Sequence, residues 1–207
     1  MPIKCVFFDF DEVVRSWKHE FDGLSDYSGI PLDAFVEIAF DPLRYESAIR
    51  GEVSGETLRA EIGLVLAECF SVENAESALE YWATRNGELV PEVLEIVRLC
   101  KERIPVALFT NASTTLNREI ETLGLTGLFD HVVNTAEVGS IKPEPEIYKY
   151  ALDLVGIEAS EAYFTDDRPE NIEAAVKLGW TGHLFDGDVV GLRSSLVKAG
   201  VLLTCPR

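Results

Sequence analysis

The stretch VFFDFDEVV, residues 6–14, decides the fold class of this chain. It is a short apolar run that ends in two aspartates, Asp9 and Asp11. Continuous rather than alternating hydrophobicity is typical of a strand in a parallel sheet that helices cover on both faces. Ligands of open α/β sheets bind beyond the carboxyl ends of the strands. The stretch therefore predicts a buried parallel strand with an acidic site at its end.

Four further apolar runs are similar to the first, and helical patterns alternate with them from residue 91 onward. Pro91 is placed to open one helix, and Gly156 and Gly179 are placed to end two others. This alternation predicts an α/β fold of three layers, with a Rossmann-like parallel sheet between helices. The expected strands are residues 5–8, 106–109, 131–133, 162–164 and 182–185, and the expected helices are residues 91–100, 114–123, 143–154 and 169–178.

Residues 17–87 break the alternation, because they contain helical patterns and no strand pattern. Ser54 and Ser71 stand where serine would cap the start of a helix. The expected helices are residues 32–39, 55–69 and 72–85. A helical insert after the first strand predicts two domains, namely an α/β core of residues 1–15 and 88–207 and a helical cap domain of residues 16–87.

Charge and composition exclude some classes of function. The chain of 207 residues has 18 basic and 36 acidic side chains, and its net charge is −18. Nucleic acid and anionic membrane surfaces carry the same sign, so we expect neither as a partner. The apolar run at the N-terminus is too short for a signal peptide, and no run could span a bilayer, which predicts a cytoplasmic protein. The oligomeric state is left open.

The cysteines give no sign of a metal site. Cys5, Cys69, Cys100 and Cys205 are widely spaced, and no CxxC pair occurs. We expect reduced, mainly buried thiols rather than zinc ligands.

Polar side chains stand at the ends of the predicted strands or just before helices. Carboxylates at close range need a cation or protons to offset their charge. An oxygen-only set of ligands favours Mg²⁺ over zinc or calcium. Together with a lysine and a threonine as anion ligands, such a site has the equipment of phosphoryl transfer through a carboxylate nucleophile. The residues are Asp9, Asp11, Thr110, Asn111, Lys142, Asp166 and Asp167.

Four stretches carry a more specific signal, because they occur together and in a fixed order. They are VFFDFDEVV (6–14), LFTNAS (108–113), EVGSIKPEPEIYKYAL (137–152) and YFTDDRPENIEAAVKLGW (163–180). With them the chain resembles the haloacid dehalogenase-like hydrolase superfamily, in the subgroup with a helical cap after the first strand. The resemblance covers the whole chain and is weakest in the cap.

The resemblance implies a role for each aspartate of the first stretch. Asp9 matches the nucleophile that attacks phosphorus, and its carboxylate would also contact Mg²⁺. Asp11 matches the general acid/base, whose backbone carbonyl would ligate the metal. The dehalogenating branch of the superfamily lacks an aspartate at this position. The resemblance therefore implies a phosphatase, with a small phosphorylated metabolite as its substrate.

The other matched residues would bind the phosphoryl group and the metal. Thr110 and the backbone amide of Asn111 would hold the phosphoryl group, and Lys142 would neutralise its oxygens and the nucleophile. Asp167 matches the main metal-binding acid of the superfamily, and Asp166 its acidic neighbour.

Glu12 departs from the pattern, since the superfamily usually has glycine there. A positive φ costs a residue with a Cβ about 1 kcal/mol or more. Glu12 therefore implies a different turn or a strained one, and its carboxylate could add negative charge to the site.

Three other functions remain open at this point. A phosphomutase would use the same residues and return the phosphoryl group to a sugar. A receiver domain also combines acids, a hydroxyl and a lysine, but the order of these residues and the helical insert argue against it. Glu12 leaves a degenerate, non-catalytic binding protein as the third.

Arg44 and Arg50 could reach a substrate anion from the cap, or pair with nearby Glu46 and Glu52.

Overall fold

A computed structural model describes residues 1–203 of the chain, and five parallel strands form its central sheet. The strand order is β5-β4-β1-β6-β7, so the first strand is the middle one. All five predicted strands are present within one or two residues of their expected ends. They are β1 (Cys5–Phe8), β4 (Val106–Thr110), β5 (His131–Asn134), β6 (Ala162–Asp166) and β7 (Thr181–Leu184).

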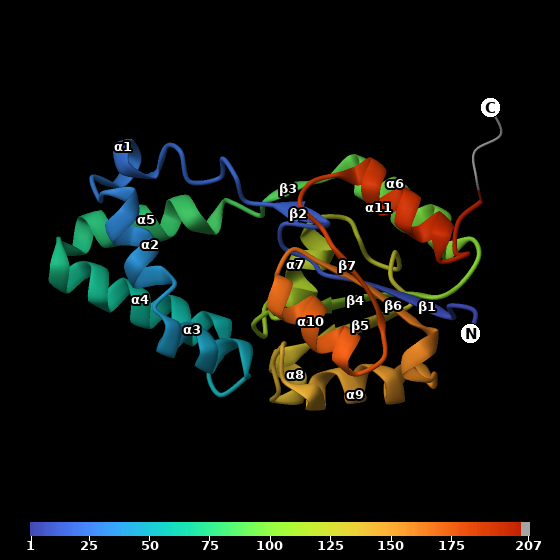
Figure 1. Ribbon diagram of the computed structural model, residues 1–207. Helices are drawn as coiled ribbons and strands as arrows, with labels where there is room; N and C mark the ends of the chain where they lie inside the picture. The colour runs from blue at the N-terminus through green and yellow to red at the C-terminus, as the bar shows by residue number, and fades with distance from the viewer. Residues whose placement is uncertain (204–207) are drawn as a thin grey trace.

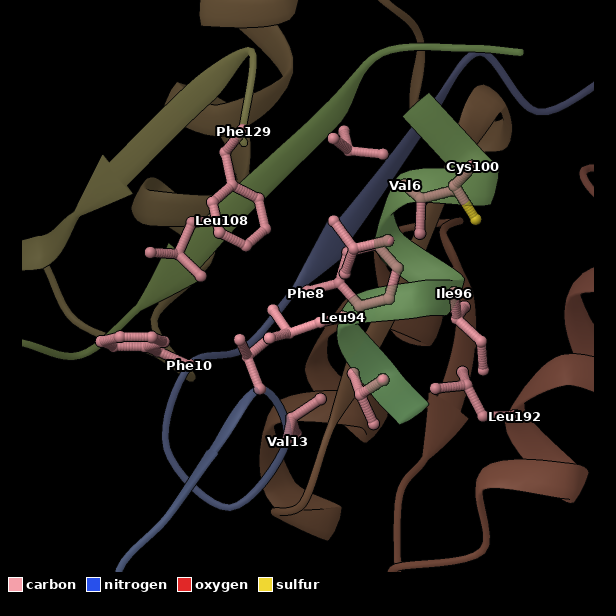
Figure 2. Packing of buried hydrophobic residues seen from close by; sticks show 14 of the residues in the cluster. Val6, Phe8, Phe10, Val13, Leu94, Ile96, Cys100, Leu108, Phe129 and Leu192 are labelled. Carbon is pink, nitrogen blue, oxygen red and sulfur yellow. The ribbon is translucent and has the colours of Figure 1, made fainter. Parts of the chain in front are cut away.

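Helices cover both faces of the sheet, which confirms the predicted α/β fold (Figure 1). Side chains alternate along β1: Val6 and Phe8 belong to one apolar cluster, and Cys5 and Phe7 belong to the other. Figure 2 shows the first cluster, where side chains of β1 lie beside those of α6. The helices are α6 (Pro91–Lys101), α7 (Leu116–Thr122) and α11 (Val189–Lys198) on that face, and α9 (Pro145–Val155) and α10 (Pro169–Lys177) on the other, with the short α8 (Thr135–Val138) and η1 (Ala159–Glu161) between strands.

Residues 17–87, between β2 (Arg15–Ser16) and β3 (Glu88–Leu89), form a separate group of helices, which we call the helical unit (Figure 1). Its buried side chains form an apolar cluster of their own, distinct from the two clusters of the sheet. The hydroxyls of Ser54 and Ser71 accept hydrogen bonds from Thr57 N and Asn74 N, as their cap positions predict. The helices are α1 (Leu24–Ser28), α2 (Leu32–Ala39), α3 (Pro42–Ile49), α4 (Gly55–Cys69) and α5 (Val72–Ala83).

Two short strands connect the helical unit to the sheet. β2 (Arg15–Ser16) enters the unit and β3 (Glu88–Leu89) leaves it, and the two pair in antiparallel register. Residues 17–87 contain no strand, as predicted. The division of the chain into two domains at residues 15/16 and 87/88 stays a prediction.

The end of α3 and the start of α4 contact the α/β part of the chain. Arg50 donates from Nη1 to Glu144 Oε2 over 3.2 Å and also contacts the other oxygen of that carboxylate. Gly51 has a φ of 73°, and a Cβ there would lie 2.0 Å from the carbonyl oxygen of Ala136 in α8. The helical unit therefore lies against the core at a contact that has no room for a side chain.

Some elements differ from the expectation. The helices α1, α3, α8 and α11 and the strands β2 and β3 were not predicted. Cys5 and Cys100 are buried as expected, but Cys69 is exposed at the end of α4, and Cys205 lies outside the described residues. Within residues 1–203 no helix is both long and apolar enough to cross a membrane.

Candidate active site

The sheet brings three of the predicted site residues to one edge. Thr110 ends β4 and Asp166 ends β6, and Asp9 follows the last residue of β1 between them. The backbone N–H of Asp9 donates to the carbonyl of Thr165 over 3.0 Å, which continues the strand pairing up to the aspartate. Asp9, Thr110 and Asp166 are all buried. Three adjacent parallel strands thus present their carboxyl ends to one site.

Lys142 lies at the centre of this site and is only 3% exposed. Its ammonium group is 2.9 Å from Asp9 Oδ1 and 2.6 Å from Asp166 Oδ2, and it donates to the carbonyl oxygen of Phe109 over 2.9 Å. Burial alone would lower the pKa of Lys142, but the charges of Asp9 and Asp166 outweigh it and raise that pKa. The lysine is therefore a fixed positive charge beside Asp9.

Three carboxyl groups gather around this lysine. Oxygens of Asp9, Asp166 and Asp167 all lie within 4.8 Å of one another, and we call these three residues the acid group. Burial raises the pKa of Asp9 to about 8, with Lys142 opposing and Asp166 adding to the shift. Burial, followed by the charge of Asp166, also raises the pKa of Asp167. An oxygen-ligated divalent cation fits this donor set, because it would offset the excess negative charge.

Asp166 is the most constrained member of the acid group. Besides the lysine contact, its carboxylate accepts hydrogen bonds from the backbone N–H of Arg168 over 2.8 Å and from Asn171 Nδ2 over 3.0 Å. These bonds fix its position at the start of α10 and satisfy both of its oxygens. Asn171 was not foreseen, and its place in the first turn of α10 gives no signal in the sequence.

The carboxylate of Asp11 lies outside the acid group. Its Oδ1 accepts hydrogen bonds from Arg15 Nε over 2.7 Å and from Trp17 Nε1 over 2.8 Å. Arg15 was not singled out from the sequence, and Trp17 was noted only as a residue just past the stretch of residues 6–14 and was given no role. One feature of the sequence could have indicated these bonds, because the charged Arg15 directly follows two valines of an apolar run.

Glu12 has a φ of 58° and is the one residue other than glycine with a positive φ in the described part of the chain. Of the two turns that Glu12 left open, the structure has the strained one. Its carboxylate accepts from the backbone N–H of Trp17 over 3.0 Å and from Ser16 Oγ over 3.3 Å. The negative charge of Glu12 therefore bonds to the loop at β2 instead of joining the acid group.

Asn111 and Lys142 hold each other in place. Asn111 Nδ2 donates to the carbonyl of Lys142 over 3.0 Å, and the backbone N–H of Lys142 donates to Asn111 Oδ1 over 2.8 Å. The resemblance implies a role for the backbone amide of Asn111 only. The structure adds a second role, because the side chain of Asn111 fixes the loop that carries Lys142.

The helical unit places Tyr45 of α3 near the site. Burial and the charge of Asp11 raise the pKa of Tyr45 to about 12, and Arg168 opposes the shift. Arg50 pairs with Glu46 and with Glu144 of the core, and Arg44 lies 3.8 Å from Asp41. Arg50 is thus engaged by carboxylates, whereas the buried Nε of Arg44 has no hydrogen bond with any of residues 1–203. Tyr45, which was not singled out, faces the charges of the site.

Comparison with known proteins shows which family the sequence matches and which curated proteins it is similar to. Residues 3–179 match the family described as haloacid dehalogenase-like hydrolase. Phosphatase MT3486 of Mycobacterium tuberculosis is 24% identical over 98% of this chain and 93% of its own length. Ribulose-1,5-bisphosphate 5-phosphatase of Halopiger xanaduensis is 33% identical over 51% of this chain and 46% of its own length.

Other relatives match over shorter parts of their length. Bifunctional epoxide hydrolase 2 of Rattus norvegicus is 41% identical over 25% of this chain, and flavin mononucleotide hydrolase 1 of Arabidopsis thaliana is 27% identical over 53%. The matches cover 9% and 44% of those two proteins, so the chain spans less than half of their length.

Solved structures share the fold. The HAD family enzyme bt-2542 of Bacteroides thetaiotaomicron gives a TM-score of 0.71 at 19% identity, over 91% of this chain and 96% of its own. A predicted HAD-like family hydrolase of Porphyromonas gingivalis gives 0.72 at 19% identity, over 96% and 99%. A second structure of bt-2542, in complex with magnesium and inorganic phosphate, gives 0.69 at 18% identity, over 90% and 96%.

Proposed function

Because this chain belongs to the haloacid dehalogenase-like hydrolases, we propose that it is a Mg²⁺-dependent phosphatase that acts on a small phosphorylated metabolite. The observation that carries the proposal is the acid group around the buried Lys142, at the carboxyl ends of three adjacent strands. Relatives named as phosphatases support it, including one that matches almost the whole chain.

The proposed metal site uses the acid group and the loop after β1. Asp9 and Asp167 would supply carboxylate oxygens, with the backbone carbonyl of Asp11 as a third ligand. Asp166 completes the predicted set, and because its oxygens already accept several hydrogen bonds, its main effect is to place Lys142. Bound Mg²⁺ would offset negative charge on the acid group and on the phosphoryl oxygens.

The proposed reaction proceeds through a phosphorylated aspartate. The carboxylate of Asp9 attacks phosphorus, and Asp11 gives a proton to the leaving oxygen. Thr110, the backbone amide of Asn111 and Lys142 hold the phosphoryl oxygens as charge develops on them. Asp11 then takes a proton from a water molecule, which attacks phosphorus and releases Asp9.

The helical unit serves as the cap in this proposal. Tyr45 faces the charges of the site, and the contacts at Arg50 and Gly51 hold the unit against the core. A unit in this place would shield the reaction from bulk water and select the leaving group. The proposed cap subgroup and the domain boundaries rest on this arrangement.

The test is phosphate release from p-nitrophenyl phosphate by the purified protein, with Mg²⁺ and with a chelator. We expect turnover that requires Mg²⁺ and that Asp9→Asn abolishes. Asp153→Asn is the matched control, since Asp153 is an exposed aspartate on α9 that pairs with Lys149, and it should keep full activity. Full activity of Asp9→Asn would overturn the mechanism.

The substrate requires a second experiment. A panel of small phosphorylated metabolites, scored by phosphate release, should yield at least one ester that is cleaved faster than p-nitrophenyl phosphate. Formation of an isomeric sugar phosphate in place of inorganic phosphate would replace the phosphatase with a phosphomutase.

A further inference from the structure

Arg15 has no part in the reaction as proposed so far, yet it is buried at the edge of the site and only 3% exposed. Its guanidinium lies 4.1 Å from the ring centre of Phe10 and 4.7 Å from that of Trp17. A buried arginine destabilises a protein unless its charge is paired and its donors are satisfied. The partners of Arg15 therefore show what its position depends on.

Those partners are two carboxylates and a backbone carbonyl. Arg15 Nε donates to Asp11 Oδ1 over 2.7 Å, and Nη1 donates to Glu119 Oε2 over 2.7 Å and to the carbonyl of Asn86 over 3.3 Å. Glu119 is in turn held by Thr115 Oγ1 over 2.6 Å. The planar guanidinium is thus anchored on α7 and on the chain next to β3, and it presents Nε to Asp11.

Both donors that reach Asp11 end on the same oxygen. Arg15 Nε and Trp17 Nε1 both donate to Oδ1, whereas Oδ2 has no hydrogen bond with any of residues 1–203. Two N–H donors occupy both lone pairs of Oδ1, so this oxygen has no free position for a proton. The geometry therefore leaves Oδ2 as the oxygen of Asp11 that can exchange a proton with a bound molecule.

We propose that Arg15 and Trp17 are positioning residues that hold Oδ1 of Asp11 and leave Oδ2 as the atom that gives and takes the proton. This inference rests on the proposed phosphatase activity and assigns an atom to its acid step. Neither residue touches the reacting atoms in this account. Both act through Asp11.

The proton balance follows from this assignment. As the bond from phosphorus to the ester oxygen breaks, the proton on Oδ2 moves to that oxygen, and the new carboxylate charge faces Arg15. In the second half, a water O–H bond breaks and its proton returns to Oδ2. The water oxygen then bonds to phosphorus while the bond from phosphorus to Asp9 breaks, so Asp11 ends as it began.

The test compares esters whose leaving groups differ in their need for a proton. The p-nitrophenolate ion leaves without one, whereas the alkoxide of β-glycerophosphate needs an acid. We expect Trp17→Phe to lower the ratio of kcat/KM for β-glycerophosphate to kcat/KM for p-nitrophenyl phosphate by roughly 10-fold or more, since a positioned general acid contributes about 100-fold or more. kcat/KM is the proper readout because it covers the steps up to the phosphorylated enzyme.

Two further variants make the result specific. Arg15→Lys keeps the positive charge but loses the planar guanidinium, whose separate N–H groups reach both Asp11 and Glu119. It should therefore also lower the ratio of the two kcat/KM values. Trp82→Phe makes the same exchange in α5, where the indole packs against Phe35 and Phe40, and it should leave the ratio unchanged.

The possible failures can be told apart. An equal loss with both esters in Trp17→Phe, or no loss with either, would overturn the positioning role while the phosphatase stands. An absence of Mg²⁺-dependent phosphate release from both esters by the unmodified protein would overturn the proposed function and the positioning role together. Trp17→Phe keeps an aromatic ring beside Phe21 and Arg15, so the test does not depend on Arg15→Lys folding.

Discussion

At the scale of single residues, the centre of the site carries more negative than positive charge. Lys142 contributes one positive charge, and Asp9 and Asp166 contribute two negative ones at hydrogen-bond distance. Without a cation, the buried site is most stable when one of these carboxyl groups is protonated. The raised pKa of Asp9, about 8, has this cause in addition to burial.

This pKa predicts how stability depends on pH in the absence of metal. The folded-state pKa of Asp9 lies above its ordinary value of 3.8, so the stabilisation is complete below about pH 4 and lost as the pH rises to about 8. We expect the free energy of unfolding to fall over that range by up to about 1.4 kcal/mol per pH unit. Urea unfolding with a chelator measures this slope.

Two comparisons assign the slope to Asp9. Asp9→Asn should flatten it because the amide does not titrate, and saturating Mg²⁺ should flatten it because the metal favours the ionised carboxylate. The same slope in Asp9→Asn as in the unmodified chain would contradict the prediction.

Glu12 gives a prediction about backbone strain. Glu12→Gly and Glu12→Ala both lose the hydrogen bonds to Trp17 and Ser16, but only alanine keeps the cost of a φ of 58°. We expect the glycine variant to be more stable than the alanine variant by about 1 kcal/mol in thermal or urea unfolding. The same pair at exposed Lys149, within α9, should show the opposite order, because glycine destabilises a helix.

The sequence predicted which strand ends carry Asp9, Thr110 and Asp166, but it did not predict the hydrogen-bond partners of the site's side chains. Asp9, Thr110 and Asp166 could be placed because strand ends of a parallel sheet converge. The hydrogen bonds of Asp11 could not be predicted, since Arg15 and Trp17 reach it only after the turn at Glu12 is formed. The side-chain role of Asn111 likewise depends on two loops 31 residues apart.

At the scale of elements, most long helices and the apolar strands of the sheet were predicted well, whereas the ten-residue α11 and the shortest polar elements were not. The helices expected at residues 32–39 and 55–69 have those bounds in the structure, because apolar periodicity marks both and a serine cap also marks the start of the second. α1 has five residues and α8 has four, and β2 and β3 have two each. A pattern of period 3.6 or 2 cannot be recognised over so few residues. Asp41 as N-cap and Pro42 in the first turn were a usable signal for α3.

The contact between α3 and α8 gives a prediction at this scale. Gly51→Ala would place a Cβ 2.0 Å from the carbonyl oxygen of Ala136, so the helical unit would have to move away from the core. Gly124→Ala is the matched control, because Gly124 also has a positive φ, 68°, but no atom within 4 Å of the added Cβ. Both variants should lose stability of about 1 kcal/mol from the backbone.

Only Gly51→Ala should also change the reaction. If closure of the helical unit completes the site, we expect a rise in KM for p-nitrophenyl phosphate in Gly51→Ala and none in Gly124→Ala. Equal KM values in the two variants would show that this contact has no part in binding the substrate.

At the scale of the whole molecule, the net charge of −18 opposes an anionic substrate unless the site has a different local sign. Lys142 alone does not reverse the sign, because it is already shared by Asp9 and Asp166. A bound divalent cation would offset the negative charge that the acid group keeps beside Lys142.

Binding of inorganic phosphate should therefore require Mg²⁺. We expect calorimetry to detect phosphate binding with Mg²⁺ and no measurable binding with a chelator. Lys142→Met should weaken phosphate binding even with Mg²⁺, whereas Lys149→Met removes an exposed lysine of α9 and should have no effect. Tight binding of phosphate without metal would contradict this account.

The antiparallel pairing of β2 with β3 has a consequence for how such a protein can diverge. The chain leaves the sheet at Ser16 and returns at Glu88, and these two residues are direct neighbours in the pair. The helices α1 to α5 between them can be lengthened, shortened or exchanged without moving the strands that carry the acid group, provided that Trp17 and the chain at Asn86 keep their contacts. Under the proposed function, heritable variation in these helices can therefore change which phosphate ester is accepted while the acid group stays constant.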